Sequence, residues 1–279
     1  MERKISCPDF AFPLMEHDKV LDLIGALGIP GVDIGLLENR SHLRPADQFP
    51  ELARHAKELK GKVEERGLKV SDVFIQAELA FDVYAPNHYE AARRQHARDL
   101  FEKTVEYASI LGADHITGLP GAAFPQVESW EASYDRCVIE QQWRAELSKK
   151  AGIPYGIEAH IGSVVEQPLQ AKQLCEDAPG MGLTLDYSHF VRLGMEDTEG
   201  DILIPYANHM HTRAAAKGVL QTCMTDNCID FVRVVQKLEE QGYQGWYCME
   251  YCWTPYWENC SRNDNVSEIL LMKEHIENI

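Results

Sequence analysis

The chain has 279 residues, of which 45% are hydrophobic, and its 27 Lys and Arg against 44 Asp and Glu give a formal net charge of −17. This length suits one large domain with a closed core, and so acidic a surface repels duplex nucleic acid and anionic membranes, so neither is an expected partner. No apolar run is long enough to cross a bilayer, and residues 1–7 lack the apolar segment of a signal peptide, so we expect a cytoplasmic protein.

The cysteines favour a reduced core over a disulfide framework or a structural zinc site. The sequence has eight of them, and none forms a C-x-x-C pair. In a chain this long such cysteines are more commonly buried thiols. Cys248 and Cys252 flank Glu250 at a spacing of two residues, so in a strand all three side chains point to the same face. We interpret these two cysteines as small core residues.

Hydrophobic patterning predicts strands and helices that alternate along the chain. The first half reads as strand 5–12, helix 18–27, strand 31–36, helix 47–66, strand 68–76, helix 88–111, strand 115–121 and helix 130–151. The second half reads as strand 153–160, helix 168–177, strand 181–186, a short helix or turn around residue 202, strand 207–212, helix 226–241 capped by Asp226, strand 245–251 and helix 266–279. Glycines after several helices mark their ends.

Strict alternation of this kind indicates parallel strands joined by right-handed crossovers. Eight such units predict a closed (β/α)8 TIM barrel that occupies residues 1–279 as a single domain. An open doubly wound sheet is the alternative. It usually carries a glycine-rich phosphate loop after its first strand, and residues 8–13, Pro-Asp-Phe-Ala-Phe-Pro, are not such a loop.

Four apolar runs in the second half end in residues that bind metals: Glu158, Asp186, His211 and Glu250. The carboxyl ends of parallel strands meet at one face of a barrel, so these side chains are expected to converge. A single carboxylate at a strand end is more commonly a helix cap or an ion-pair partner, and it is the combination that indicates a metal site. Three carboxylates and one imidazole favour one divalent ion, Mn²⁺ first, with Mg²⁺ or Co²⁺ as alternatives.

The sequence resembles the xylose isomerase-like barrels, a superfamily of sugar isomerases, ketose 3-epimerases, inosose dehydratases and endonuclease IV. The resemblance covers most of the chain and is carried by Ile157-Glu158, Asp186-x-x-His189, His209-x-His211 and Met249-Glu250. It implies that Glu158, Asp186, His211 and Glu250 are the metal ligands. It also implies that His189 contacts the substrate, and that His211 rather than His209 is the ligand, because the family uses the later histidine.

Departures from the ketose 3-epimerases leave the exact reaction open. These enzymes have a substrate-binding arginine six residues after the histidine ligand, where this chain has Lys217, while Arg213 lies two residues after it. Lys217 and Arg213 are both candidate substrate-binding residues, the alternative for each being a solvated loop charge. The epimerases also have a glutamate where this chain has Val164, and His160 is a candidate to replace it.

Trp253 belongs to an aromatic loop, residues 251–257, that follows the last predicted ligand. Its aromatic side chains are expected either to stack on a sugar ring and cover the site or to contact another subunit. A homodimer or homotetramer is therefore left open as the assembly.

The resemblance implies a metal-dependent isomerase or epimerase that acts on a small ketose or keto-sugar. Glu158 and Glu250 would each serve as ligand and acid/base, passing a proton through a metal-stabilised cis-enediolate. A lyase or dehydratase that eliminates from an oxidised cyclitol or a 3-keto-glycoside is the alternative. An endonuclease IV-like repair enzyme is disfavoured, because residues 35–36 and 118–119 lack the extra histidines and the charge is −17.

Overall fold

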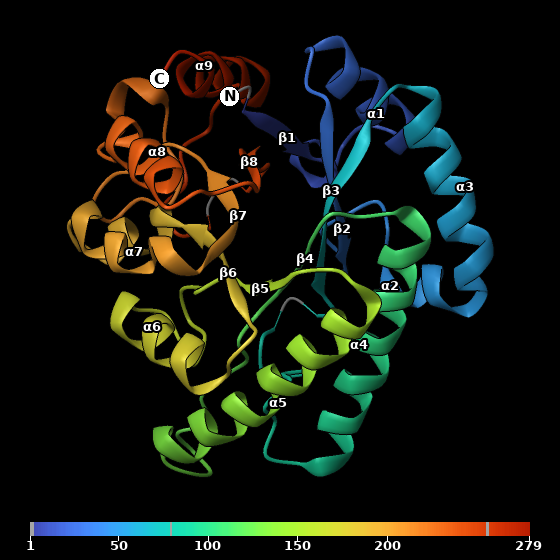
Figure 1. The fold of residues 1–279 in the computed structure, drawn as a ribbon, viewed down its shortest axis with the longest axis vertical. Coiled ribbons are helices and arrows are strands. Elements are labelled where there is room, and N and C mark those ends of the chain that lie inside the picture. The colour runs from blue at the N-terminus through green and yellow to red at the C-terminus, as the bar shows by residue number, and fades with distance from the viewer. Residues whose placement is uncertain (1–2, 79, 255–256) are drawn as a thin grey trace.

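The eight predicted strands form a closed parallel barrel. The computed structural model describes residues 3–78, 80–254 and 257–279. Strands pair in chain order, and β8 closes the ring on β1 (Figure 1). Within the described residues the strands are β1 (Lys4–Pro8), β2 (Gly31–Leu37), β3 (Lys69–Gln76), β4 (Ile116–Gly118), β5 (Tyr155–Ile157), β6 (Gly182–Asp186), β7 (Ala207–Thr212) and β8 (Trp246–Met249). The prediction of a (β/α)8 barrel is confirmed.

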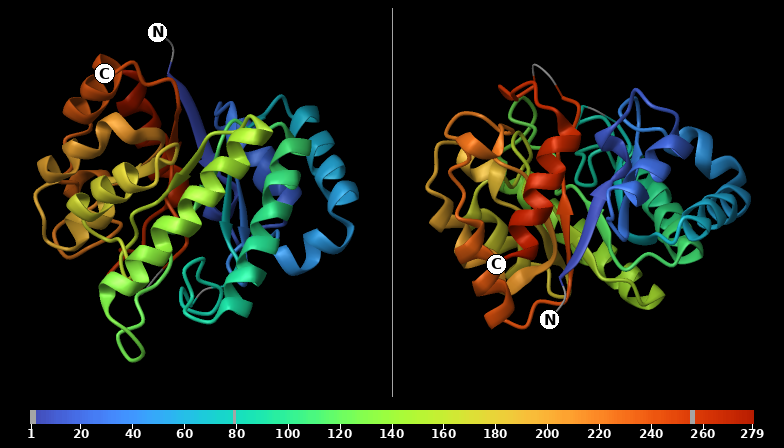
Figure 2. Two further views of the ribbon diagram at one scale, coloured as in Figure 1. Left: turned by 60° about the horizontal axis from the view of Figure 1, so that its bottom comes forward. Right: turned by 90° about the horizontal axis from the view of Figure 1, so that it is seen from above.

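Helices surround the barrel and cover its outer surface (Figures 1 and 2). Those among the described residues are α1 (His17–Ala26), α2 (Pro45–Gln48), α3 (Leu52–Glu65), α4 (Ala91–Leu111), α5 (Trp130–Ala151), α6 (Pro168–Asp177), α7 (Tyr187–Arg192), α8 (Phe231–Glu240) and α9 (Asn265–Glu277). Short 3-10 helices are η1 (Asp9–Ala11), η2 (Phe49–Glu51), η3 (Asp197–Tyr206) and η4 (Met224–Asp226). The predicted bounds of α5 and α6 agree with the structure.

Other helices differ from the prediction for physical reasons. The segment predicted as one helix over 47–66 is divided into α2, η2 and α3, because Pro50 lacks an amide hydrogen and interrupts the ladder. The predicted Asp226 cap is wrong: α8 begins at Phe231, and the side chain of Asp230 accepts a hydrogen bond from the backbone amide of Arg233. Helix α7 was not predicted, because its six residues are too few to show a helical period.

The register of the last strands brings the predicted ligands to one level. Asp186 on β6 lies beside His211 on β7, and His211 lies beside Cys248 on β8. Glu250 follows Cys248 by two residues and so continues on the same face, one step nearer the barrel mouth. In the right view of Figure 2, β1 rises from the amino terminus at the bottom, so the carboxyl ends of the parallel strands lie at the top.

A close approach between Gly35 on β2 and the ring of Phe10 supports the predicted ligand His211. A Cβ on Gly35 would lie 2.4 Å from the ring of Phe10, so only glycine leaves room for that ring. The Phe10 ring contacts Phe74 edge-on at 6.1 Å between centroids, and Phe74 contacts the imidazole of His211 at 5.9 Å. Gly35 therefore allows an aromatic pair to pack behind a predicted ligand.

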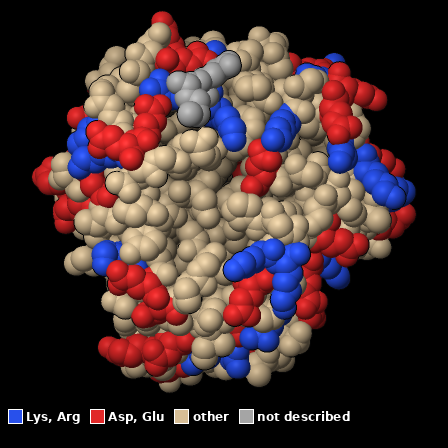
Figure 3. Space-filling model, viewed as in Figure 1, with Lys and Arg blue, Asp and Glu red and all other residues tan. Residues whose placement is uncertain are grey.

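Most charged side chains outside the barrel interior lie on the surface. Figure 3 shows acidic and basic residues mixed around the periphery of the face where the strands begin, while uncharged residues form most of its centre. This face therefore offers no extended basic surface. No described helix is both long and apolar enough to span a membrane.

Candidate metal centre

Backbone hydrogen bonds place the four predicted ligands. Glu158 directly follows β5, and its amide donates to the Gly118 carbonyl at 3.0 Å. Glu250 directly follows β8, and its amide donates to the carbonyl of Thr212 at 3.0 Å. Asp186 ends β6 and caps α7, because its Oδ1 accepts from the backbone amide two residues later at 2.8 Å. The ends of the strands, rather than flexible loops, therefore hold these carboxylates.

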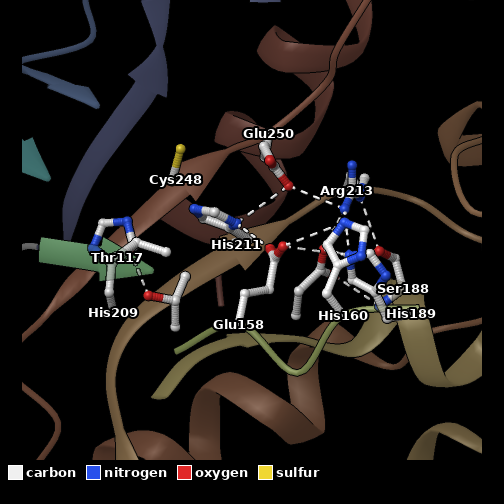
Figure 4. A network of polar contacts seen from close by, with 12 residues as sticks. Thr117, Glu158, His160, Ser188, His189, His209, His211, Arg213, Cys248 and Glu250 are labelled. Atoms are coloured by element: carbon white, nitrogen blue, oxygen red, sulfur yellow. Dashed lines mark hydrogen bonds and ion pairs between the residues drawn. The ribbon is translucent and has the colours of Figure 1, made fainter. Parts of the chain in front are cut away.

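The structure brings all four side chains together. Each offers a ligand atom within 4.8 Å of the others, and the exposed fractions are 2% for Glu158, 3% for Asp186, 1% for His211 and 4% for Glu250. The Nδ1 atom of His211 lies 2.7 Å from Oε1 of Glu158 and 3.3 Å from Oε2 of Glu250 (Figure 4). We call these four residues the carboxylate cluster.

Arg213 is the main internal counter-charge of the carboxylate cluster. The residue is 4% exposed, and its guanidinium hydrogen-bonds to Oδ2 of Asp186 and lies 3.1 Å from Oε2 of Glu250. Its Nε donates to the Ser188 hydroxyl at 2.8 Å, and Nη2 lies 3.2 Å from Nε2 of His189. Arg213 was predicted to bind the substrate, and its contacts among the described residues are instead to two carboxylates, a histidine and a serine of the protein. A substrate role for it stays a prediction.

These contacts shift the pKa values of the cluster. Burial alone raises the pKa of Glu158, but hydrogen bonds and charge from His189 and His211 lower it well below its usual range. Burial likewise raises the pKa of Asp186, and the charge of Arg213 reverses this and lowers it. For His211, burial lowers the pKa, and Glu250 and Glu158 raise it well above the ordinary value. The lowered pKa values of Glu158 and Asp186 keep these two carboxylates ionised, and an ionised carboxylate can neutralise a cation.

The donor set fits a divalent cation. Ligand atoms on opposite sides of an octahedral ion with bonds of roughly 2.1 Å lie about 4.2 Å apart, comparable with the spread of the carboxylate cluster. Nε2 of His211 is buried and has no hydrogen-bond partner among the described residues. Oε2 of Glu250 is also buried, and its contacts there are ion pairs with His211 and Arg213 rather than hydrogen bonds, so it keeps a lone pair that a bound ion could use. Three carboxylates and an imidazole are ligands typical of Mn²⁺ or Mg²⁺, whereas a structural Zn²⁺ site usually has cysteine thiolates.

Two predicted substrate residues lie beside the cluster. Nε2 of His189 is 3.6 Å from Glu158 Oε2 and 3.5 Å from Asp186 Oδ2. Nε2 of His160 is 3.9 Å from the same Glu158 oxygen, and its Nδ1 lies 2.8 Å from the Ile161 carbonyl. Burial lowers the pKa of His160 to about 3, so the ring is neutral near pH 7. Both imidazoles therefore lie beside the carboxylate cluster, and a substrate contact for either one stays a prediction.

Two other predicted substrate residues do not join the cluster. Lys217 is exposed on a loop and pairs with Glu196. Trp253 follows the last ligand by three residues, and 43% of its surface is exposed. A substrate role for either remains a prediction. Pro255 and Tyr256, which belong to the same predicted aromatic loop, lie outside the described residues.

A second buried polar network, missed from the sequence, lies beneath the cluster. Asp33 on β2 is 2.7 Å from Nε2 of His209, and its other oxygen accepts from Ser71. Asp72 pairs with His115 at 2.7 Å, and the His115 and His209 rings stack at 5.2 Å. Burial raises the pKa of Asp33, but the charge of His209 holds it below its usual range. Asp33 lies inside an otherwise apolar strand, and this was the sign in the sequence that a buried polar partner existed.

A cavity opens at the mouth above His160. It measures about 630 Å³, and its lining includes Arg40, Phe81, Arg192 and Trp257. The ring of His160 contacts Phe81 at 4.8 Å and Trp257 at 5.6 Å between centroids, so it connects the cavity wall to the carboxylate cluster. This volume is typical of small-molecule sites.

A closed parallel barrel with buried polar side chains at the carboxyl ends of its strands has the layout of a TIM barrel. The profile of the xylose isomerase-like TIM barrel family matches residues 21–274, and the chain belongs to that family. No curated protein matches the sequence significantly.

Several solved structures are similar to this chain in fold. D-psicose 3-epimerase from Clostridium cellulolyticum H10, solved with D-tagatose, has a TM-score of 0.76 at 13% identity, covering 99% of both chains. The 3-keto-D-glucoside 4-epimerase YcjR from E. coli has a TM-score of 0.73 at 14% identity, covering 100% of both. A xylose isomerase-like barrel from Mycobacterium smegmatis, in complex with magnesium, has a TM-score of 0.75 at 15% identity, covering 99% of this chain and 96% of that one.

Proposed function

We propose that this protein is a divalent-metal-dependent isomerase or epimerase of a ketose or keto-sugar. The observation that carries the proposal is the buried carboxylate cluster at the barrel mouth, in which two glutamates from strands far apart in the ring, after β5 and after β8, face one histidine. Similarity in fold to two sugar epimerases agrees with it. We propose Mn²⁺ first, with Mg²⁺ or Co²⁺ as alternatives.

The proposed chemistry is proton transfer next to a carbonyl. The ion, held by Glu158, Asp186, His211 and Glu250, would polarise the carbonyl and acidify the neighbouring C–H bond. One of the two glutamates removes the proton to give an enediolate, and the other returns a proton to complete the reaction. The proposal has the substrate bind between these two glutamates, and the approach of their carboxylates to His211 Nδ1 from different strands supports it.

Residues next to the carboxylate cluster orient the substrate and the metal ligands. His189 and His160 supply ring nitrogens to substrate hydroxyls, and the low pKa of His160 keeps it a neutral hydrogen-bonding group. Arg213 holds the Asp186 and Glu250 carboxylates in place through its contacts to both. The Phe81 and Trp257 rings around His160 exclude water from one side.

The test is solvent deuterium exchange with a panel of ketoses and keto-sugars in the presence of Mn²⁺. Glu158→Gln and Glu250→Gln should each slow turnover by about 10²–10⁴-fold, the usual effect of removing a general base, while losing less metal than activity. Glu166→Gln is the matched control, since this nearby glutamate accepts from the Gly162 amide and lies outside the carboxylate cluster.

Two results would contradict the proposal. Full metal content with near-normal turnover in both cluster variants would show that these glutamates are not the bases. Loss of water from an oxidised cyclitol, or release of the aglycone from a 3-keto-glycoside, without exchange into recovered ketoses would establish the lyase alternative instead.

A further inference from the structure

The cavity at the barrel mouth has a basic wall in an otherwise acidic protein. Arg40, in the segment after β2, and Arg192, at the end of α7, both line it. The chain carries a net charge of −17, so two arginines at one opening need a local explanation.

Arg40 lacks a carboxylate partner among the described residues. Its guanidinium lies over the ring of Trp257 at 5.5 Å from the centroid, and no described carboxylate is within ion-pair distance. Arg44 provides a contrast, because it lies four residues later and donates to Asp47 at 2.7 Å. Stacking on an aromatic ring leaves the in-plane N–H donors of a guanidinium available to a ligand.

Arg192 supplies a second, partly neutralised charge. Its Nη2 pairs with Glu258 at 2.9 Å, and its Nε is buried without a hydrogen-bond partner among the described residues. With Glu258 counted, the lining carries two positive charges and one negative charge. One positive charge is therefore left for a ligand.

We propose that the substrate carries one anionic group, a carboxylate or a phosphate, which Arg40 binds at the mouth while the sugar carbonyl lies at the carboxylate cluster. This inference rests on the proposed function and names its substrate class. Trp257 lies between the proposed anion site and the carboxylate cluster, since it contacts both the guanidinium of Arg40 and the imidazole of His160. The cavity of about 630 Å³ leaves room for the anionic end of a substrate, and His160 lies between its Phe81 and Trp257 wall and the carboxylate cluster.

Three matched sugars distinguish a phosphate from a carboxylate as the anionic group of the substrate. The three probes are a neutral ketohexose, the same sugar phosphorylated on its terminal hydroxyl, and the keto-uronate in which that carbon is a carboxylate. Calorimetric titration of the Mn²⁺-loaded protein measures binding whether or not the sugar reacts, and deuterium exchange measures the reaction separately. Arg40→Gln is the test variant and Arg44→Gln the control.

We expect one anionic probe to bind more tightly than the neutral sugar, and Arg40→Gln to weaken that binding by about 10–100-fold, the range for a charged hydrogen bond. Binding of the neutral sugar should stay within about twofold in both variants. The preferred anion identifies carboxylate or phosphate.

Equal binding of all three probes, or no effect of Arg40→Gln, overturns the inference while exchange still tests the proposed function. Arg40-dependent anion binding without exchange into these probes or into any member of the ketose and keto-sugar panel supports the anion site and overturns the proposed function.

Discussion

Replacing Arg213 by Met should destabilise the metal-free protein far more than the metal-loaded one. The guanidinium is buried, contacts Asp186 and Glu250, and donates to Ser188. Methionine keeps much of the volume but leaves two buried carboxylates without their counter-charge. Breaking a buried ion pair in this way costs about 3–5 kcal/mol.

A divalent ion should recover part of that loss, because it neutralises the same carboxylates. Recovery of half corresponds to about 2 kcal/mol, which by a closed cycle means roughly 30-fold tighter metal binding in the variant. At about 2 °C per kcal/mol for a domain of this size, the metal-free variant should melt roughly 6–10 °C below wild type.

Thermal melts with chelator and with saturating Mn²⁺, together with metal titration by calorimetry, measure both quantities. Arg233→Met is the control: Arg233 pairs with Asp197 at 2.6 Å and Asp201 at 2.7 Å, away from the cluster, so Mn²⁺ should not recover its loss. If Mn²⁺ raises the melting temperature of wild type and Arg213→Met equally, the guanidinium and the ion do not share these carboxylates, and the reasoning is refuted.

Further predictions concern metal, thiols and acid. Metal analysis should find about one divalent ion per chain, and three zinc ions would contradict the proposed function. His211→Ala should lose more metal than His209→Ala, and equal retention would show that the wrong histidine was chosen. A thiol reagent should modify only Cys223 and Cys228 in the native protein, because the other thiols are buried, and fast reaction of further thiols would contradict the packing. His160 has a pKa of about 3 against about 6.5 unfolded, so the unfolded chain binds its proton first and stability falls as pH drops between those values. Urea melts of His160→Phe should therefore show a shallower loss between pH 6 and pH 4, and an unchanged slope would exclude this group as a cause.

The barrel and the cluster could be predicted because they depend on patterns that repeat. Eight apolar runs separated by helices allow few topologies, and ligands at the ends of successive parallel strands must converge. Glu158 and Glu250 lie just beyond the strands that were expected to contain them, yet they still reach the mouth, because each amide remains bonded to the neighbouring strand.

Contacts between distant segments could not be predicted in the same way. The bonds from Arg213 to Asp186 and Glu250 depend on which rotamer a long side chain adopts once the strands are assembled. The pairing of Asp33 with His209 joins positions 176 residues apart and leaves no local pattern. The missing partner of Arg40 is likewise visible only when every nearby carboxylate has been placed.

The Asp33–His209 pair under the carboxylate cluster restricts how this protein can change over generations. A substitution of Asp33 alone removes the ion-pair partner of the buried His209. A substitution of His209 alone removes the ion-pair partner of the buried Asp33 carboxylate. Either single substitution should destabilise the protein by about 3–5 kcal/mol, whereas exchanging both residues for apolar ones of similar volume can be neutral or stabilising. The two positions should therefore be inherited as one unit, and lineages that lose one of them should have lost the other.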